Sequence, residues 1–447
     1  MTRDQKSSLF YTSKILDAWL PEKMFYDHIS GLSVGIVHRG KLVYSKGFGY
    51  ADVAAHRKAT AQTCYRIASI SKTFTAIAIM QLVERKKLKL KEPIGTYLPW
   101  LPRDFRKLTV DELLSHKSGA LRDGDTHHWA DNAFPDRKGL RRSIVNTHPL
   151  GKLRHHFKYS NFAYALLGQI IENVGNTSYE RHVTKHIINK LALKHTLPEY
   201  STRAKRWLAK GYTRPVPREK QRTVLHVRTN SYASATGFLS NVPDLAAYLT
   251  AISHGKLIHN KTLSKMARKV SRTRTKTEDD WYGLGLRIWK IRKHTFIGHT
   301  GSFAGFRSAI MMDPKSDIGI ILLANSTDMK VTDAARGIAN AIFGISGFFA
   351  PSNTKRPSRN TQRIEGTYRG LWQDITVVGI GADLLAFNPD TDSPLSGAAI
   401  LRDVDKGKFV IEVGDGFDSN GEYATFLGKQ RAHTLMWGSM SYKRVAK

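Results

Sequence analysis

The spacing of hydrophobic residues changes along the chain, and this spacing predicts where helices and strands lie. Near the N-terminus, apolar residues recur at the spacing of one helical face and predict a helix over residues 5–28. The segments 32–37 and 42–48 are rich in β-forming residues and flank a tight turn at 38–41, which predicts a β-hairpin. A long and very basic stretch, roughly 72–270, is predicted to be mostly helical.

Short apolar segments follow this stretch and predict further strands. Four of them are strand candidates, at 282–289, 295–299, 306–312 and 318–324, and a closing helix is predicted over 333–343. Strands at both ends with helices between them predict one antiparallel sheet interrupted by a helical insertion. We therefore expect an α/β (α+β) fold for this part of the chain.

The C-terminal part of the chain has a different pattern. Residues 346–362 are rich in Pro, Ser, Asn and basic residues without an apolar period, which predicts a linker. Beyond it, about seven short alternating segments are separated by Gly, Asp, Asn and Pro turns, as in a small antiparallel barrel or sandwich. The sequence thus predicts two domains, 1–345 and 363–447, joined by that linker.

The composition limits the class of protein. The chain has 447 residues, and its 41% hydrophobic and 10% aromatic content is enough to bury real cores, which excludes wholesale disorder. Its single cysteine, Cys64, excludes an internal disulfide framework and a Cys-rich zinc module. Cys64 is interpreted as a buried apolar residue, not as a second nucleophile.

The charge is unusual, with 70 Lys and Arg against 37 Asp and Glu, a formal net charge of +33. Residues 363–447 hold 10 basic and 11 acidic side chains, so the whole excess lies in 1–362. Three clusters carry much of it, at 137–158, 203–222 and 261–276. None has a base-reading motif, so we expect no specific nucleic-acid partner. A solvated basic surface is favoured, and weak contact with an anionic polymer or a membrane surface is the alternative.

Two observations bear on location. No run of residues approaches the roughly 18–20 apolar residues that a membrane span needs. The first eight residues, Met-Thr-Arg-Asp-Gln-Lys-Ser-Ser, do not form the apolar core of a signal peptide. A cytoplasmic protein is therefore expected.

The pattern Ser-x-x-Lys occurs three times, and its context differs each time. Ser352–Lys355 falls in the predicted linker, and Ser253–Lys256 falls at the end of a helical stretch. Ser69 instead opens a strong helical pattern, so Ser69 and Lys72 are expected on one face of its first turn. A helix N-terminus adds partial positive charge and free N–H groups that suit an oxyanion. The alternative is that Ser69 is only an N-cap.

Two further motifs favour the catalytic interpretation. Tyr159-Ser160-Asn161 precedes an apolar helix, and the run 298–302, Gly-His-Thr-Gly-Ser, closes a predicted strand. In this order and at these separations, the motifs resemble the serine β-lactamase and penicillin-binding-protein superfamily. The resemblance is to its branch of class C β-lactamases, D-alanyl-D-alanine carboxypeptidases, D-aminopeptidases and esterases. It covers roughly residues 10–345, and 363–447 more weakly resembles the lipocalin-like barrel of some peptidases in that branch.

The resemblance implies a role for each matching residue. Ser69 would be the nucleophile, and Lys72 and Tyr159 would share the roles of general base and general acid. Asn161 would donate to the substrate's amide, and the backbone N–H groups of Ser69 and Ser302 would form the oxyanion hole. The implied substrate-contacting residues are Asn161, His299, Thr300, Gly301 and Ser302. Because a tyrosine with a pKa of about 10 is a poor base, we expect Lys72 and the basic surroundings to favour the Tyr159 phenolate.

Two departures from the β-lactamase pattern affect the expected substrate. His299 stands where many β-lactamases have lysine, so this position lacks a permanent cation for a β-lactam carboxylate. No carboxylate matches the additional deacylation base of class A enzymes. Both departures favour a peptidase acting on D-amino-acid-containing peptides or a small-acyl esterase. A β-lactamase or D-alanyl-D-alanine carboxypeptidase is the alternative.

No cofactor or metal is expected. The pairs His127-His128 and His155-His156 lack acidic partners at ligand spacing, and surface positions are favoured for them. The expected partner is a small-molecule or short-peptide substrate, and the barrel makes a homo-oligomer plausible by resemblance. An alternative of another class is a non-catalytic scaffold or polyanion-binding protein on the same fold.

Overall fold

The protein is described here by a computed structural model. It describes residues 3–145, 147–219, 221–273, 280–348, 359–381, 383–405, 407–412, 419–428 and 431–446. Contacts between residues divide the chain into two compact units. One unit is residues 29–331, and the other combines residues 1–28 with 332–447.

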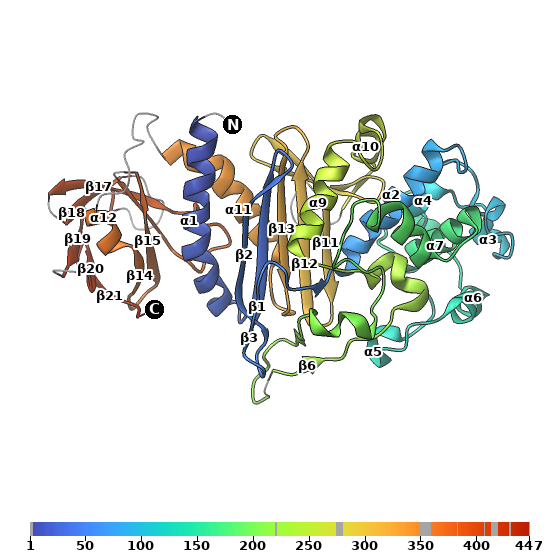
Figure 1. The fold of residues 1–447 in the computed structure, drawn as a ribbon, viewed down its shortest axis with the longest axis horizontal. Coiled ribbons are helices and arrows are strands. Elements are labelled where there is room, and N and C mark those ends of the chain that lie inside the picture. Colours follow the sequence, from blue (N-terminus) through green and yellow to red (C-terminus); the bar gives the residue numbers. More distant parts are fainter. Residues whose placement is uncertain are drawn as a thin grey trace. The chain divides into compact units, whose positions relative to one another are not determined.

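The unit 29–331 is built on an antiparallel sheet that, among the described residues, has nine strands in the order β3-β2-β1-β13-β12-β11-β10-β9-β8 (Figure 1). The strands are β1 (Gly31–His38), β2 (Lys41–Asp52), β3 (Arg57–Lys58), β8 (Ser271–Arg272), β9 (Asp280–Tyr282), β10 (Arg287–Ile291), β11 (His294–Phe303), β12 (Phe306–Asp313) and β13 (Ile318–Ala324). The first strand pairs with the last, with Leu32 opposite Ala324, and all eight residues of β1 are buried. This confirms the predicted sheet with an insertion.

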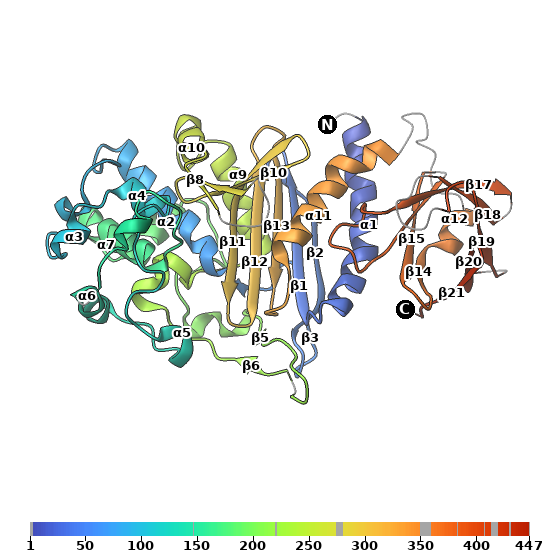
Figure 2. The ribbon, with the colours of Figure 1, turned by 180° about the vertical axis from the view of Figure 1, so that it is seen from behind.

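Helices fill the insertion between β3 and β8. They are α2 (Ser71–Glu84), α3 (Arg103–Arg106), α4 (Val110–Leu114), α5 (His128–Asp131), α6 (Arg137–Val145), α7 (Asn161–Gly175), α8 (Tyr179–Val183), α9 (Val242–Ser253) and α10 (Asn260–Met266). The helix α9 packs across β1, β2, β12 and β13. Figure 2, the view from behind, agrees with Figure 1 that α2, α4 and α7 gather beyond β11. All of Ser71–Leu82 is buried, so α2 is a core helix that is covered on every side, its polar residues included.

The insertion is less helical than the sequence predicts. Short helical turns occur at η1 (Ala68–Ile70), η2 (Ile94–Thr96), η3 (Gly151–Leu153), η4 (Thr184–Ile188), η5 (Thr202–Arg206), η6 (Asn230–Tyr232) and η7 (Ala233–Gly237). Two small sheets pair β4 (Tyr65–Arg66) with β7 (Leu239–Ser240) and β5 (Gly211–Tyr212) with β6 (Thr223–Val224). Between α8 and α9 the chain forms only short turns and small sheets, so the expectation of a mostly helical stretch is wrong there. The runs of apolar residues at helical spacing are short in this segment.

The predicted strand 282–289 is also wrong in detail, because β9 ends at Tyr282 and β10 begins at Arg287. The turn between them depends on two glycines. Gly285 has a φ of +79°, and a Cβ on Gly283 would lie 2.0 Å from the carbonyl oxygen of Met266. The close approach of this turn to the end of α10 therefore excludes a continuous strand.

The second unit contains a closed barrel, which among the described residues has eight antiparallel strands. They are β14 (Gly366–Arg369), β15 (Asp374–Ile380), β16 (Asp383–Phe387), β17 (Ala399–Asp405), β18 (Lys408–Glu412), β19 (Tyr423–Leu427), β20 (Thr434–Trp437) and β21 (Met440–Arg444). The barrel prediction is confirmed and the sandwich alternative is not. The segment 434–442 forms the hairpin β20–β21, because Gly438 turns with a φ of +54°.

Helices complete this unit. They are α1 (Arg3–Tyr26), α11 (Val331–Gly344), η8 (Ile345–Phe348) and α12 (Arg359–Ile364). The α1 helix contacts β15, and the buried Trp19 donates a hydrogen bond from Nε1 to the carbonyl of Thr391 at 3.2 Å. The predicted linker 346–362 lies mostly outside the described residues, and the described residues at its two ends are helical. None of the described helices has the length and apolar character to cross a bilayer.

Candidate active site

Ser69 lies in the turn η1, which runs directly into the buried helix α2. Its neighbour Ala68 has a φ of +49°, which is uncommon for a residue with a Cβ and marks a constrained turn. The backbone of Ile67 holds this turn on two sides. Its N–H donates to the carbonyl of Phe238 at 3.0 Å, and its carbonyl accepts from Ser308 Oγ on β12 at 2.8 Å. The prediction of a helix N-terminus at Ser69 is correct within two residues.

Lys72 lies on the first turn of α2 and is fully buried. Its Nζ lies 3.2 Å from Ser69 Oγ, 2.8 Å from Asn161 Oδ1 and 2.8 Å from the carbonyl oxygen of Ala235. Burial lowers the pKa of Lys72 well below its usual value, although the negative charge of Asp123 opposes this. The predicted pairing of Ser69 with Lys72 is therefore present in the structure.

Tyr159 precedes α7, with its ring centroid 4.9 Å from Lys72 Nζ and 4.4 Å from the ring of His116. Burial raises the pKa of Tyr159 to about 12, although a hydrogen bond with Ser69 and the positive charges of Arg287 and Arg122 lower it. The expectation that basic surroundings favour the phenolate is therefore wrong in this structure. Loss of solvation outweighs the cations.

Asn161 is the first residue of α7, where Ser160 caps the helix by accepting from the N–H of Ala163. Its side chain is buried and connects Lys72 to Asp123. Asn161 Oδ1 accepts from Lys72, and Asn161 Nδ2 donates to Asp123 Oδ1 at 2.6 Å. The structure thus gives the amide two protein partners. Its NH₂ group has a second hydrogen, and the substrate contact expected of Asn161 stays a prediction.

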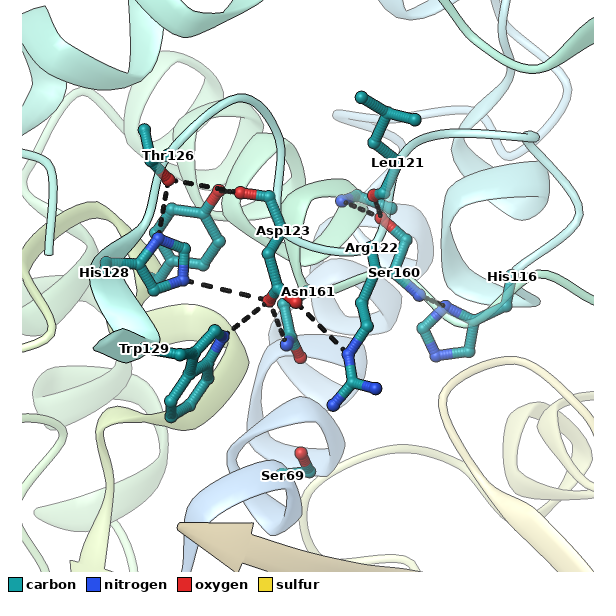
Figure 3. Close-up of polar contacts among 12 residues, drawn as sticks. Ser69, His116, Leu121, Arg122, Asp123, Thr126, His128, Trp129, Ser160 and Asn161 are labelled. Atoms are coloured by element: carbon teal, nitrogen blue, oxygen red, sulfur yellow. Dashed lines mark hydrogen bonds and ion pairs between the residues drawn. The ribbon is translucent and has the colours of Figure 1, made fainter. Parts of the chain in front are cut away.

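Asp123 is the central acceptor of this polar cluster, which Figure 3 shows beside Ser69. In addition to Asn161, it accepts from Trp129 Nε1 at 2.8 Å and pairs with Arg122 Nε at 3.2 Å. His128 Nε2 lies 3.8 Å from the carboxylate. These donors and charges lower the pKa of Asp123 to about 2, although burial opposes them. The expected surface position is wrong for His128, whose side chain is fully buried.

His299 lies on β11 and is buried and neutral in character. Its Nδ1 lies 2.6 Å from the carbonyl oxygen of Thr300, so this nitrogen carries the proton, and its Nε2 accepts from Tyr282 Oη at 3.0 Å. Burial lowers the pKa of His299 well below its usual value, and the Lys72 and Arg287 cations lower it further. His299 therefore acts as a neutral hydrogen-bonding group beside Tyr282.

A permanent cation nevertheless lies next to His299. Arg287 on β10 donates from Nη1 to Thr300 Oγ1 at 3.3 Å, and its Nη2 lies 3.9 Å from Asp280. Position 299 itself has no permanent cation, and Arg287 places one beside it. The neighbouring strand supplies the charge, because β10 pairs with β11 and sets Arg287 opposite Gly298.

Gly301 and Ser302 occupy the end of β11 that lies against η1. A Cβ on Gly301 would lie only 2.2 Å from the carbonyl oxygen of Ile67 and 2.2 Å from Ser308 Oγ. Glycine at this position therefore lets β11 approach the segment that carries Ser69. Ser302 follows directly, and its side chain is exposed.

Comparison with known proteins agrees with this arrangement. The Beta-lactamase family profile matches residues 16–343, which is most of the chain. The chain belongs to the β-lactamase family. It is a serine hydrolase of the β-lactamase and penicillin-binding-protein superfamily with a C-terminal barrel.

Relatives in this family share about a quarter of their residues with the chain. Protein flp of Staphylococcus aureus (strain MW2) is 27% identical over 387 residues, which is 83% of this chain and 73% of the relative. A Beta-lactamase of Escherichia coli (strain K12) is 24% identical over 349 residues, or 70% of this chain and 89% of the relative.

Two solved structures have a fold similar to that of this chain. The octameric penicillin-binding protein homologue from Pyrococcus abyssi superposes with a TM-score of 0.65 at 24% identity, covering 96% of this chain and 98% of that one. The D-amino acid amidase from Ochrobactrum anthropi SV3 gives a TM-score of 0.64 at 22% identity, covering 77% and 100%. At these identities the likeness concerns the fold.

The sequence motifs of this β-lactamase-family chain do not include every residue of the site. Asp123 and Arg287 were not predicted, because one lies in a loop without a motif and the other reaches the site through strand pairing. Cys64 is buried as predicted, and burial raises the pKa of its thiol to about 12, which makes a thiolate nucleophile unfavourable.

Proposed function

We propose that the protein hydrolyses amide or ester bonds of small substrates through an acyl-enzyme on Ser69. The contact between Lys72 Nζ and Ser69 Oγ, at 3.2 Å, carries this proposal. The other two partners of Lys72 are carbonyl oxygens, which can only accept hydrogen bonds. A neutral amine would therefore donate both its hydrogens to Asn161 and Ala235 and keep its lone pair for the Ser69 proton.

The direction of each pKa shift supports separate roles for Lys72 and Tyr159. Burial favours the neutral amine of Lys72, which can act as the base, and a pKa of about 12 keeps Tyr159 protonated, so it can act as the acid. Ser69 Oγ would attack the carbonyl carbon and pass its proton to Lys72. Tyr159 would protonate the leaving nitrogen or oxygen, and the proton on Lys72 would then return to Tyr159.

Hydrolysis of the acyl-enzyme would use the same groups in a second cycle. Water would replace the leaving group, lose a proton to Lys72 and attack the acyl carbon. Tyr159 would protonate Ser69 Oγ as the bond to the acyl carbon breaks, and the proton on Lys72 would then pass to Tyr159. The N–H groups of Ser69 and Ser302 would stabilise the oxyanion in both cycles, since Gly301 allows β11 to lie close to the nucleophile turn.

The leading substrates are small peptides that contain D-amino acids and small-acyl esters. The fold similarity to the D-amino acid amidase from Ochrobactrum anthropi SV3 supports this class, as does that to the D-stereospecific amidohydrolase from Streptomyces sp.. A D-alanyl-D-alanine carboxypeptidase or β-lactamase is the second candidate. Arg287 supports it, because a guanidinium beside Thr300 could bind a substrate carboxylate. A homo-oligomer is part of the proposal, and light scattering coupled to gel filtration tests it.

The test is a substrate panel on the wild type and two matched variants. The panel contains a p-nitrophenyl short-chain ester, D- and L-aminoacyl anilides and a chromogenic cephalosporin. Ser69→Ala should abolish hydrolysis, whereas Ser253→Ala, at the second Ser-x-x-Lys pattern, should retain it. A fluorophosphonate or penicillin probe should give a covalent adduct on Ser69 by mass spectrometry. Full activity of Ser69→Ala, or labelling elsewhere, would refute the mechanism. A wild type that neither hydrolyses any substrate of the panel nor forms an adduct would leave a non-catalytic role.

A further inference from the structure

The polar cluster around Asp123 has a function in the reaction that the sequence motifs do not assign. We infer that Asp123 is a positioning residue for acyl transfer: it fixes the orientation of the Asn161 amide and provides the negative charge that stabilises Lys72 when Lys72 receives the proton of Ser69. This inference rests on the proposed function. It concerns a residue that does not itself contact Ser69.

The first part follows from the chemistry of the amide. Asn161 can place either its oxygen or its nitrogen toward Lys72, and only the oxygen can accept a hydrogen bond from Lys72. A carboxylate accepts hydrogen bonds and does not donate them. Because Asp123 Oδ1 lies 2.6 Å from one end of the amide, that end must be the NH₂ group, and the oxygen must face Lys72 at 2.8 Å. Asp123 therefore determines the orientation of Asn161.

The second part follows from the charges. The residues that contact Lys72 come from three parts of the chain. They are Ser69, three residues before it, Ala235 of η7, and Tyr159, Asn161 and Tyr164 at or just before α7. The charges of Asp123 and Arg122 act on Lys72. The charge of Lys72 in turn acts on His116 and His299. Burial keeps the two histidines neutral. Among the described residues, the fixed charges that act directly on Lys72 are therefore one anion, Asp123, and one cation, Arg122. The second cation of the site, Arg287, acts on Tyr159 and His299.

Asp123 remains an anion through the reaction because the protein surrounds it with donors. Asn161 and Trp129 donate hydrogen bonds to it, and Arg122 pairs with it on the other oxygen, as Figure 3 shows. When Lys72 takes the Ser69 proton, a new positive charge forms in a fully buried place. The hydrogen-bonded path from Lys72 through Asn161 to Asp123 gives that charge a nearby counter-charge, which lowers the cost of forming it.

The experiment measures kcat/KM for a neutral p-nitrophenyl ester against pH. Asp123→Asn keeps the shape and removes the charge, so the base becomes weaker and the amide loses its fixed orientation. The acidic limb of the profile should move to lower pH, and the plateau should fall on the order of tenfold to a hundredfold. Arg122→Gln removes the opposing cation, so its acidic limb should move to higher pH. Asp125→Asn, at an exposed position on the same loop, should leave the profile unchanged.

A residue that only supported the fold would, when replaced, lower the plateau without moving the acidic limb. Opposite movements of that limb in Asp123→Asn and Arg122→Gln therefore distinguish the proposed role from simple support of the fold. An unmoved limb in Asp123→Asn, or movement in the same direction in both variants, would overturn the inference. If Asp123→Asn does not fold, as judged by circular dichroism, Arg122→Gln and the charge-preserving Asp123→Glu still test it. Ser69→Ala in the same assay tests the proposed function separately, because its residual activity does not depend on Asp123.

Discussion

Gly301 controls how closely the strand β11 approaches the turn that carries Ser69, and Gly301→Ala tests this directly. A Cβ at position 301 would lie 2.2 Å from the carbonyl oxygen of Ile67, whereas ordinary contact begins near 3.4 Å. The turn and the strand must therefore separate by roughly 1 Å, since a packed interior has no free space to absorb the methyl group. The hydrogen bond from Ser308 Oγ to Ile67 resists such a movement.

The consequence is a misplaced oxyanion hole. Ser302 follows Gly301 and Ser69 lies two residues after Ile67, so the separation moves one proposed N–H donor away from the other. A displacement of about 1 Å in a catalytic site costs roughly a hundredfold in rate. We expect kcat/KM of Gly301→Ala for a p-nitrophenyl ester to fall by about that factor, with a loss of about 1–3 kcal/mol in stability from overpacking.

The assay compares Gly301→Ala with Gly151→Ala, because a Cβ on Gly151 meets no atom within 4 Å. Steady-state hydrolysis, the rate of fluorophosphonate labelling and thermal unfolding by circular dichroism are measured on both variants. The control should match the wild type in all three. Wild-type kcat/KM and melting temperature in Gly301→Ala would show that the strand and the turn are not in close contact, and the reasoning would fail.

Two further predictions concern other parts of the unit 29–331. His182 is buried, neither ring nitrogen has a hydrogen-bond partner among the described residues, and burial lowers its pKa from 6.5 to about 4. The unfolded chain then binds a proton below pH 6.5 while the folded chain does not, so stability falls by up to about 3 kcal/mol as pH falls from 6.5 to 4. Urea unfolding of His182→Leu should show a flatter dependence in this window, and an unchanged slope would contradict the assignment. Arg287→Gln should raise KM about tenfold to a hundredfold for substrates with a free carboxylate, since a charge-assisted hydrogen bond contributes about 1.5–3 kcal/mol. It should leave a neutral ester unaffected, and equal effects on both substrates would refute carboxylate binding.

Local sequence patterns predicted those parts of the site that depend on local structure. Ser69 and Lys72 are three residues apart at the start of a helix, so their contact follows from helical geometry. The contact between Lys72 and Asn161 spans 89 positions and was not predicted; only the resemblance to a family assigned both residues to one site. Arg287 could not be predicted, because its place beside Thr300 depends on the register of β10 and β11.

The protonation of Tyr159 shows a second limit. The sequence shows a strong excess of positive charge, and from this excess and the nearby Lys72 the Tyr159 phenolate is expected. In the structure the pKa of Tyr159 is raised, which favours the protonated phenol instead. The cause is loss of solvation, which depends on packing by residues that are distant in the sequence, such as His116. In the barrel, the turn at Gly438 joins β20 to β21, and short turns of this kind leave little pattern in the sequence.

The pairing of β1 with β13 has a consequence for synthesis of the protein. The partner of Leu32 is Ala324, so the ribosome must add roughly 290 more residues, which takes about 15–60 s at ordinary rates, before the sheet can close. Ser69, Lys72 and Tyr159 are all made during this interval. Throughout it, β1 can pair with β2 on one side only, and an apolar strand edge stays open. The nascent chain thus depends on protection from aggregation until its last sheet strand is released.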